Sequence, residues 1–206
     1  MISCLIPAYN EEKNIKNTIN SLNKINIEKE IIVINDGSTD KTAEIASKEK
    51  IDLLINLNKN VGKAGAVSCA IPLTKFKYIL LTDADLLGIN DEILNLIYPV
   101  LKNEAEMTIA SNIPFTIKFF SGLRCIKKDV FFLEKNFLEK IKKSKYNLEN
   151  ELNNLAKLYK LRVKYVPMKK IRNTHKIKKY GMIKGTMKTL EMYYQLTYYI
   201  LKNKIN

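Results

Sequence analysis

Two aspartates, Asp83 and Asp85, stand two positions apart and directly follow the apolar run YILLT at residues 78–82. Carboxylates at this spacing on an extended segment can face one cavity and share one ion. Hard divalent cations such as Mg2+ and Mn2+ prefer oxygen ligands and keep positions open for substrate phosphates. An ion held there would neutralise the charge of a departing diphosphate. The alternative interpretation is that the two aspartates lie in an ordinary solvated loop.

Two more polar turns follow apolar runs. PAYNE at residues 7–11 comes after the run 2–6, and NDGSTD at residues 35–40 comes after the run 30–34. Taken singly, the first could be a plain strand end and the second an ordinary turn with a helix cap. Three such turns in this order predict one shared location at the carboxyl edge of a sheet, where open α/β sheets bind their ligands.

The surrounding pattern supplies the elements that would position these turns. Apolar runs predict buried strands at 2–6, 30–34, 53–55, 78–82 and 107–110, with helical spacing between them at 11–22, 39–50, 64–71 and 91–101. This alternation is typical of βαβ units and a parallel sheet. In the second half, we expect helices at 131–143 and 148–159, a strand at 161–166 and a final amphipathic helix at 183–202.

Composition places the chain among globular proteins. It has 206 residues, 46% hydrophobic and 27% charged, which fits one domain over 1–206 and excludes a disordered chain. No run approaches the ~18 apolar residues of a membrane span, and the N-terminus lacks the basic region of a signal peptide, so we expect a cytoplasmic protein. The three cysteines, Cys4, Cys69 and Cys125, are too scattered for a disulfide framework or a zinc site and are predicted to be buried thiols.

Charge is distributed unevenly along the chain. Residues 1–112 carry 12 Lys or Arg and 15 Asp or Glu, whereas residues 113–206 carry 23 and 6. Such an asymmetry indicates an anionic partner, whether nucleotide, phosphate, membrane surface or nucleic acid.

Four strings, CLIPAYNEEKNI, EIIVINDGSTDKTAEIA, NVGKAGAV and YILLTDADL, resemble family 2 glycosyltransferases with the nucleotide-sugar A-type fold. The likeness is specific over residues 2–90 and looser at 121–131, 146–153 and 166–181. It points to the soluble branch that includes dolichyl-phosphate mannose synthase and glucosyl-3-phosphoglycerate synthase. The resemblance implies a single-domain α/β fold with a mostly parallel central sheet flanked by helices, and transfer of a hexose from a UDP- or GDP-sugar.

The resemblance also assigns roles to individual residues. Asp85, Glu149 and Arg124 would be catalytic, with Glu149 acting as a base or holding sugar hydroxyls. For Glu149 the alternative is a helix-start glutamate, and for Arg124 a surface arginine. Mn2+ or Mg2+ would be held by Asp83, Asp85 and His175. The nucleotide sugar would be bound by Pro7, Ala8, Tyr9, Glu11, Asp36, Gly37, Ser38, Gly62, Lys63, Asp83, Ala84 and Asp85.

The basic second half, 113–206, would then be the acceptor half, and residues 1–112 the donor half. Residues 164–188 carry nine Lys or Arg and no acid, which indicates a solvated face, a phosphate-gripping loop around His175, or attraction to anionic lipid. We therefore expect a phosphorylated acceptor, either a polyprenyl phosphate or a small phospho-acid. Tyrosines and apolar residues at 187–201 suit peripheral contact with the inner membrane face or a homodimer seam.

Two other function classes compete with this interpretation. A sugar nucleotidyltransferase would need a glycine-rich phosphate loop after the first strand, where the chain instead has PAYNEE at residues 7–12. A non-enzymatic protein that binds nucleic acid or a membrane surface would not need Glu11, Asp83 or Asp85. We expect no nucleic-acid partner. The motifs GxGxxG and GxxxxGK[ST] are absent from the sequence, which argues against dinucleotide and P-loop sites.

Overall fold

The computed structural model describes residues 1–111, 121–144 and 147–173. The chain divides into two compact units, Met1–Arg172 and Asn173–Asn206, and the described architecture is that of the first. The helix expected at 183–202 lies outside the described residues, so that helix and the single domain over 1–206 stay predictions. Within the described part of the chain, no helix is long and apolar enough to cross a membrane.

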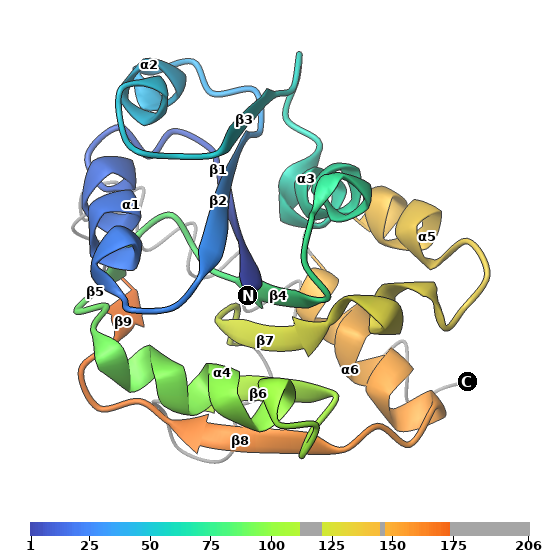
Figure 1. Cartoon of the computed structure of the whole chain (residues 1–206). Coiled ribbons are helices and arrows are strands. Elements are labelled where there is room, and N and C mark those ends of the chain that lie inside the picture. Colours follow the sequence, from blue (N-terminus) through green and yellow to red (C-terminus); the bar gives the residue numbers. More distant parts are fainter. Residues whose placement is uncertain (112–120, 145–146, 174–206) are drawn as a thin grey trace, which may run out of the picture. The chain divides into compact units, whose positions relative to one another are not determined.

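A seven-stranded sheet forms the centre of the unit, with strand order β3-β2-β1-β4-β7-β6-β8 (Figure 1). Every pairing is parallel except those of β7, which runs antiparallel to both β4 and β6. The predicted mostly parallel sheet is therefore confirmed. The strands are β1 (Ile2–Ala8), β2 (Lys29–Asn35), β3 (Leu53–Asn56), β4 (Tyr78–Leu81), β6 (Met107–Ser111), β7 (Arg124–Lys127) and β8 (Val163–Pro167); β5 (Leu86–Leu87) and β9 (Arg172–Asn173) form a separate two-stranded sheet.

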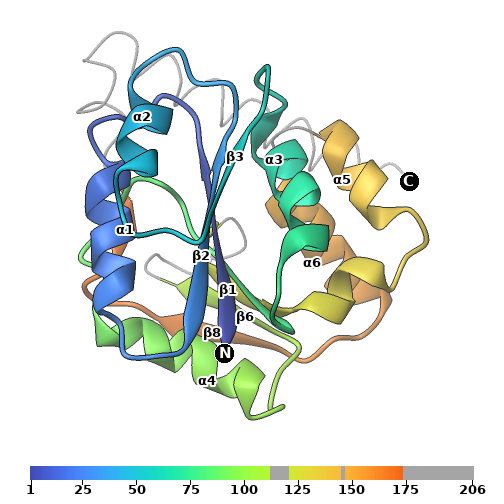
Figure 2. The ribbon, with the colours of Figure 1, turned by 45° about the horizontal axis from the view of Figure 1, so that its top comes forward.

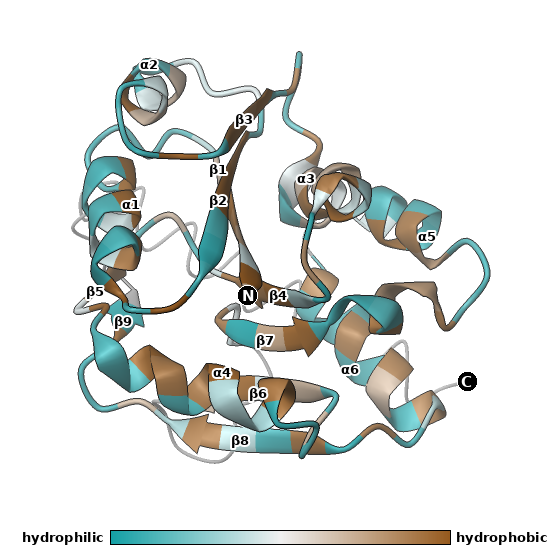
Figure 3. Cartoon of the chain, viewed as in Figure 1, coloured by the Kyte–Doolittle hydropathy of each residue, from teal (hydrophilic) through white to brown (hydrophobic). Residues whose placement is uncertain are grey.

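Helices cover both faces of the sheet, as Figures 1 and 2 show. Successive side chains of a strand point to opposite faces, so Ile31 and Val33 enter one core while Ile32 and Ile34 enter the other. The runs are apolar without alternation because both faces are covered. In Figure 3, β1 is mostly brown, whereas α1 and α5 carry both colours. The first core packs under α1 (Ile15–Lys24), α2 (Thr42–Ser47) and α4 (Leu94–Leu101), and the second under α3 (Gly62–Ala70), α5 (Phe137–Ser144) and α6 (Leu148–Leu158).

Two local predictions were wrong in detail. The helix expected at 131–143 is instead a 3-10 helix, η4 (Lys128–Phe132), followed by α5. Asn136 stands between them with a φ of 64°, a left-handed conformation that an α-helix does not accommodate. The helix expected at 91–101 begins as a 3-10 turn, η2 (Asp91–Ile93), before α4; a third 3-10 turn, η1 (Ile71–Leu73), follows α3.

Strand β7 was not predicted at all. Its sequence, RCIK, has a basic residue at each end and no apolar run. It becomes a strand because β4 and β6 pair with it from both sides, so tertiary context decides over local pattern. The cysteine prediction holds for Cys4 and Cys125, whereas Cys69 is only half-buried; burial raises the pKa of the Cys4 thiol to about 12.

Candidate functional site

The three polar turns meet at one edge of the sheet, as predicted. β1 ends at Ala8 directly opposite Asn35, the last residue of β2. On its other side, Leu5 of β1 pairs with Leu81, the last residue of β4. The turns that follow these strands, including the one that carries Asp83 and Asp85, therefore leave the sheet side by side.

The first two turns are joined by direct hydrogen bonds. The backbone amide of Asn10 donates to Ser38 Oγ at 3.0 Å, and the amide of Thr39 donates back to Asn10 Oδ1 at 2.9 Å. The amide of Glu11 donates to Thr42 Oγ1 at 2.7 Å. Glu11 is itself buried, whereas Tyr9 is 40% exposed. These hydrogen bonds join the two turns, and Tyr9 stays exposed beside them.

Asp36 fixes the start of α3 from the end of β2. It is only 3% exposed, and its two carboxylate oxygens accept from the amides of Val61 at 2.7 Å and Gly62 at 2.9 Å. Burial raises the pKa of Asp36, and these two hydrogen bonds act against the rise. The predicted role of Asp36 in binding the nucleotide sugar stays a prediction.

Two glycines allow the turn after β2 to approach the start of α3 closely. Gly37 has a φ of 69° and Gly62 a φ of 82°, which is left-handed backbone that favours glycine. A Cβ on Gly37 would also lie 2.5 Å from the backbone carbon of Lys59. Gly37 therefore packs so closely against the loop before α3 that a larger residue there would collide with its backbone.

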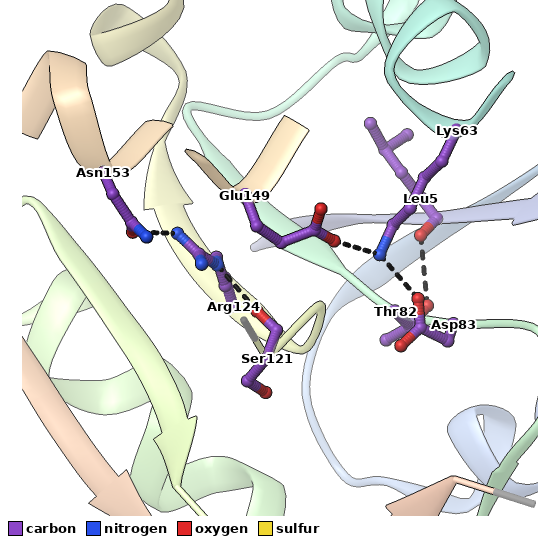
Figure 4. Close-up of polar contacts among 8 residues, drawn as sticks. All are labelled: Leu5, Lys63, Thr82, Asp83, Ser121, Arg124, Glu149 and Asn153. Atoms are coloured by element: carbon purple, nitrogen blue, oxygen red, sulfur yellow. Dashed lines mark hydrogen bonds and ion pairs between the residues drawn. The ribbon is translucent and has the colours of Figure 1, made fainter. Parts of the chain in front are cut away.

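Lys63 lies at the centre of the site, between carboxylates from two other elements (Figure 4). Its Nζ is 2.6 Å from Asp83 Oδ1 and 2.7 Å from Glu149 Oε1. Burial lowers the pKa of Lys63, but the charges of Asp83 and Glu149 outweigh burial and raise it above the ordinary value. Three of the predicted site residues, from α3, the turn after β4 and α6, are thus brought together in one ion-pair network.

Arg124 lies near the Lys63 network but is buried. It is fully buried, which rules out the surface arginine considered from the sequence. Its Nε donates to the carbonyl of Ser121 at 2.8 Å and its Nη1 donates to Asn153 Oδ1 at 2.8 Å. Burial lowers the pKa of Arg124 to about 10, against the opposing charge of Glu149. Figure 4 shows Arg124 between Ser121 and Asn153, on the far side of Glu149 from Lys63.

Three site residues were missed by sequence reasoning. Thr18 of α1 donates its hydroxyl to the carbonyl of Ala84, within the Asp83–Asp85 turn. Asn153 holds Arg124, and Gly122 packs so closely that a Cβ there would lie 2.3 Å from Lys63 Nζ. No local pattern distinguishes these residues, because each role depends on a partner far away in the sequence.

The donor set of the site suits a hard divalent cation. Asp83 and Asp85 supply carboxylate oxygens at the end of a buried strand, and substrate phosphates would have to supply further ligands. The part of the chain that the structure describes holds no group of three or more His, Cys, Asp and Glu side chains able to bind a metal. His175, the predicted third ligand, lies outside the described residues.

Comparison with known proteins identifies the family. Residues 3–160 match the family model described as glycosyl transferase family 2. The chain belongs to glycosyl transferase family 2. An uncharacterized protein of Methanocaldococcus jannaschii is 32% identical over 90% of the chain and 85% of its own length. Poly-beta-1,6-N-acetyl-D-glucosamine synthase of Staphylococcus epidermidis is 32% identical over 62% of the chain, which spans only 34% of that protein.

Solved glycosyltransferase structures share the fold of this family 2 chain. Glucosyl-3-phosphoglycerate synthase from Mycobacterium tuberculosis, in complex with Mn2+, UDP and phosphoglyceric acid, matches with a TM-score of 0.67 at 18% identity, over 84% of the chain and 70% of that protein. A mannosyltransferase from Pyrobaculum calidifontis, in complex with GDP-Man and Mn2+, matches with a TM-score of 0.66 at 17% identity, over 81% of the chain and 54% of that protein. At these identities the likeness establishes the fold alone.

Proposed function

We propose that this family 2 glycosyltransferase moves a hexose from a UDP- or GDP-sugar to a phosphorylated acceptor, with Mn2+ or Mg2+ as cofactor. The observation that carries the proposal is the Lys63 network, which joins a donor-side carboxylate, Asp83, to an acceptor-side carboxylate, Glu149. Similar folds that bind UDP with Mn2+ or GDP-Man with Mn2+ support a nucleotide-sugar donor.

Donor binding is assigned to the carboxyl edge of β1, β2 and β4. Tyr9 is exposed and would offer its ring to the base, and the two joined turns that carry Glu11 and Ser38 would hold a nucleoside. Asp83 and Asp85 would hold the divalent ion, with His175 as a third ligand. A bound ion there supplies positive charge that stabilises the leaving diphosphate.

Lys63 would add a second positive charge, from the protein itself, to stabilise the leaving diphosphate. An ammonium in the first turn of α3 lies beside the predicted ion site and can reach the diphosphate as a point charge. Electrostatic stabilisation of this kind, in a site largely shielded from water, is usually the largest catalytic effect of a protein.

The ion pair of Glu149 favours a phosphorylated acceptor. Oε1 of Glu149 is already engaged by the Lys63 ammonium at 2.7 Å, so an acceptor hydroxyl would have to compete with that cation for it. An acceptor phosphate is already ionised and needs no base, whereas a hydroxyl would. In this proposal Glu149 positions sugar hydroxyls and Lys63, and the basic residues of the second half attract the acceptor. A polyprenyl phosphate would bring the protein to the inner membrane face.

A donor screen tests the proposal. UDP- and GDP-sugars would be added with Mn2+ or Mg2+, and thermal stabilisation and donor hydrolysis would be measured for the wild type and Asp85→Ala. We expect one nucleotide class to raise the melting temperature in a metal-dependent manner, and Asp85→Ala to abolish that dependence. The proposal fails if no nucleotide sugar stabilises the wild type and Asp85→Ala leaves the metal response unchanged.

A second screen identifies the acceptor. Phosphoglycerate, other phospho-acids and anionic vesicles that contain polyprenyl phosphate would each be offered with the donor found above. Product formation with one phosphorylated acceptor, but not with its dephosphorylated counterpart, is the expected result. Equal rates with both forms would overturn the assignment of a phosphorylated acceptor and leave the donor assignment intact.

A further inference from the structure

The ammonium of Lys63 lies between the carboxylates of Asp83 and Glu149. Its Nζ approaches Asp83 Oδ1 to 2.6 Å and Glu149 Oε1 to 2.7 Å. The three side chains are 21%, 23% and 16% exposed, respectively, so water screens this network only in part. The predicted metal ligand Asp83 therefore already has a cation, and that cation belongs to the protein.

Interactions within helix α3 do not favour a lysine at position 63. Lys63 lies in the first turn of α3, where the helix dipole disfavours a positive charge. Glu149 lies in the first turn of α6, where the dipole favours a negative one. The carboxylates of Asp83 and Glu149 therefore hold the Lys63 ammonium in place against the dipole of its own helix.

Gly122 encloses the ammonium from a third side. A Cβ at this position would lie 2.3 Å from Lys63 Nζ and 2.7 Å from Asp83 Oδ2. The backbone of Gly122 thus packs directly on the ion pair. Lys63 is thus contacted by α6, the turn after β4 and the segment before β7, while its flexible side chain can still move from Asp83 to another anion.

A divalent ion bound to Asp83 would stand within a few ångströms of this ammonium. Like charges at that distance repel strongly where water is largely excluded, so the ion and the ammonium compete for one carboxylate. We propose that Lys63 is a resident counter-ion of the site, which weakens divalent-ion binding to the bare protein and moves from Asp83 to the donor diphosphate when the ion binds. The diphosphate part of this statement rests on the proposed function; the competition for Asp83 does not.

Calorimetric titration of the full chain with Mn2+ alone tests the competition. Lys63→Met removes the charge and keeps the length of the side chain, so we expect Mn2+ affinity to rise about tenfold or more. Lys63→Arg keeps the charge and should stay within about threefold of the wild type. A Lys63→Met protein that binds Mn2+ no more tightly than the wild type would overturn the proposal.

The chain offers a matched control for the loss of a bridging lysine. Lys140 also lies between two carboxylates, at 3.4 Å from Glu134 and 3.2 Å from Glu151, away from the predicted ion site. Lys140→Met should therefore leave Mn2+ affinity unchanged. An equal gain in Lys140→Met would show a general charge effect and overturn the specific role of Lys63.

Two further variants keep the test decisive. Adding Asp83→Asn to Lys63→Met should cancel the gain in Mn2+ affinity, and a gain that persists would place the ion elsewhere and refute the competition. Circular dichroism and thermal melting would confirm folding of each variant. If Lys63→Met does not fold, Lys63→Gln, which still donates hydrogen bonds without a charge, replaces it with the same expected gain.

Titration with UDP and GDP in the presence of saturating Mn2+ tests the movement toward the diphosphate. We expect Lys63→Met to bind the preferred nucleotide about tenfold more weakly than the wild type, because a charge-assisted contact is lost. Unchanged nucleotide affinity would refute the movement. If neither protein binds a nucleotide while Lys63→Met still gains Mn2+ affinity, the proposed function fails and the counter-ion role stands.

Discussion

The side-chain hydroxyl of Thr18 donates a hydrogen bond of 2.8 Å to the carbonyl oxygen of Ala84, the residue between Asp83 and Asp85. Thr18 lies in α1 and is fully buried. A buried carbonyl without a partner is costly, so this bond selects one conformation of the turn. Helix α1 thereby sets the direction in which the two predicted metal ligands leave the sheet.

Replacing Thr18 by valine removes the hydroxyl and keeps the shape of the side chain. We expect the free energy of unfolding to fall by about 1–3 kcal/mol, as is usual for an unsatisfied buried group. Mn2+ affinity in the presence of nucleotide should fall by about tenfold, because the Asp83–Asp85 turn is no longer fixed. Calorimetry and thermal melting measure the two effects.

Two controls separate positioning from general stability. Thr18→Ser keeps the hydroxyl and should restore Mn2+ affinity. Thr108 is also fully buried and donates its hydroxyl to a backbone carbonyl, that of Leu96, at 2.6 Å. Thr108→Val should cost similar stability and leave Mn2+ affinity unchanged; an equal loss of affinity in both valine variants would refute the role of Thr18.

Asp36 should control donor binding through the start of α3. Asp36→Asn loses one of the two acceptors that hold the Val61 and Gly62 amides, so we expect a cost of about 1–3 kcal/mol in unfolding free energy. Nucleotide affinity should fall as well, because Lys63 follows Gly62 directly. Asp52→Ala removes a similar bond, from the amide of Ile31 to the Asp52 carboxylate at 2.8 Å, and should affect stability alone. Unchanged nucleotide affinity in Asp36→Asn would contradict this prediction.

Much of the first half was predictable because its signals are local. Apolar runs buried on both faces identified β1, β2, β3, β4 and β6, and the polar turns after β1, β2 and β4 meet at one edge of the sheet, as expected. The resemblance assigned both Lys63 and Asp83 to the nucleotide-sugar site, and the structure places Lys63 Nζ 2.6 Å from Asp83 Oδ1. In this half, β1, β2 and β3 are neighbours in the sheet, and one helix connects each strand to the next along the chain.

The second half was less predictable because its roles depend on distant partners. Glu149 and Lys63 form an ion pair although they are 86 positions apart in the sequence. No sequence pattern near either residue predicts this pair. The burial of Arg124 was also unexpected, since a buried arginine needs particular partners, here Ser121 and Asn153. Local pattern likewise missed β7, because a strand that begins with Arg124 is stable only once β4 and β6 are in place.

Arg124 should act as a positioning residue for α6. Arg124→Met removes its bonds to Ser121 and Asn153, so we expect unfolding free energy to fall by about 2–4 kcal/mol. Because Glu149 lies one turn before Asn153, kcat should fall while donor Kd changes little. Asn153→Leu should reproduce part of the loss in kcat. A donor Kd that rises in parallel with the loss of kcat would argue against this role.

Glu106 gives a pH dependence of stability that is independent of the site. Its hydrogen bonds to Arg162, at 2.5 and 3.1 Å, lower its pKa from 4.5 to about 2. A carboxylate with a depressed pKa stabilises the folded state above its unfolded pKa, and this contribution is lost as pH falls from about 4.5 toward 2. Glu106→Gln should therefore be less stable than the wild type at pH 7, and the difference should shrink over that range in urea titrations. A constant difference from pH 7 to pH 2 would contradict the assignment.

Gly122 should be required for activity more than for folding. A Cβ there would meet the ends of two flexible side chains, Lys63 and Asp83, which can move aside without shifting the backbone. Gly122→Ala should therefore change the melting temperature little, whereas the displaced ion pair should lower kcat/KM on the order of 100-fold. Ser121→Ala is the matched control, because it keeps the carbonyl that Arg124 binds and adds no atom near Lys63. Wild-type kcat/KM in Gly122→Ala would show that the enclosure of Lys63 has no part in the reaction.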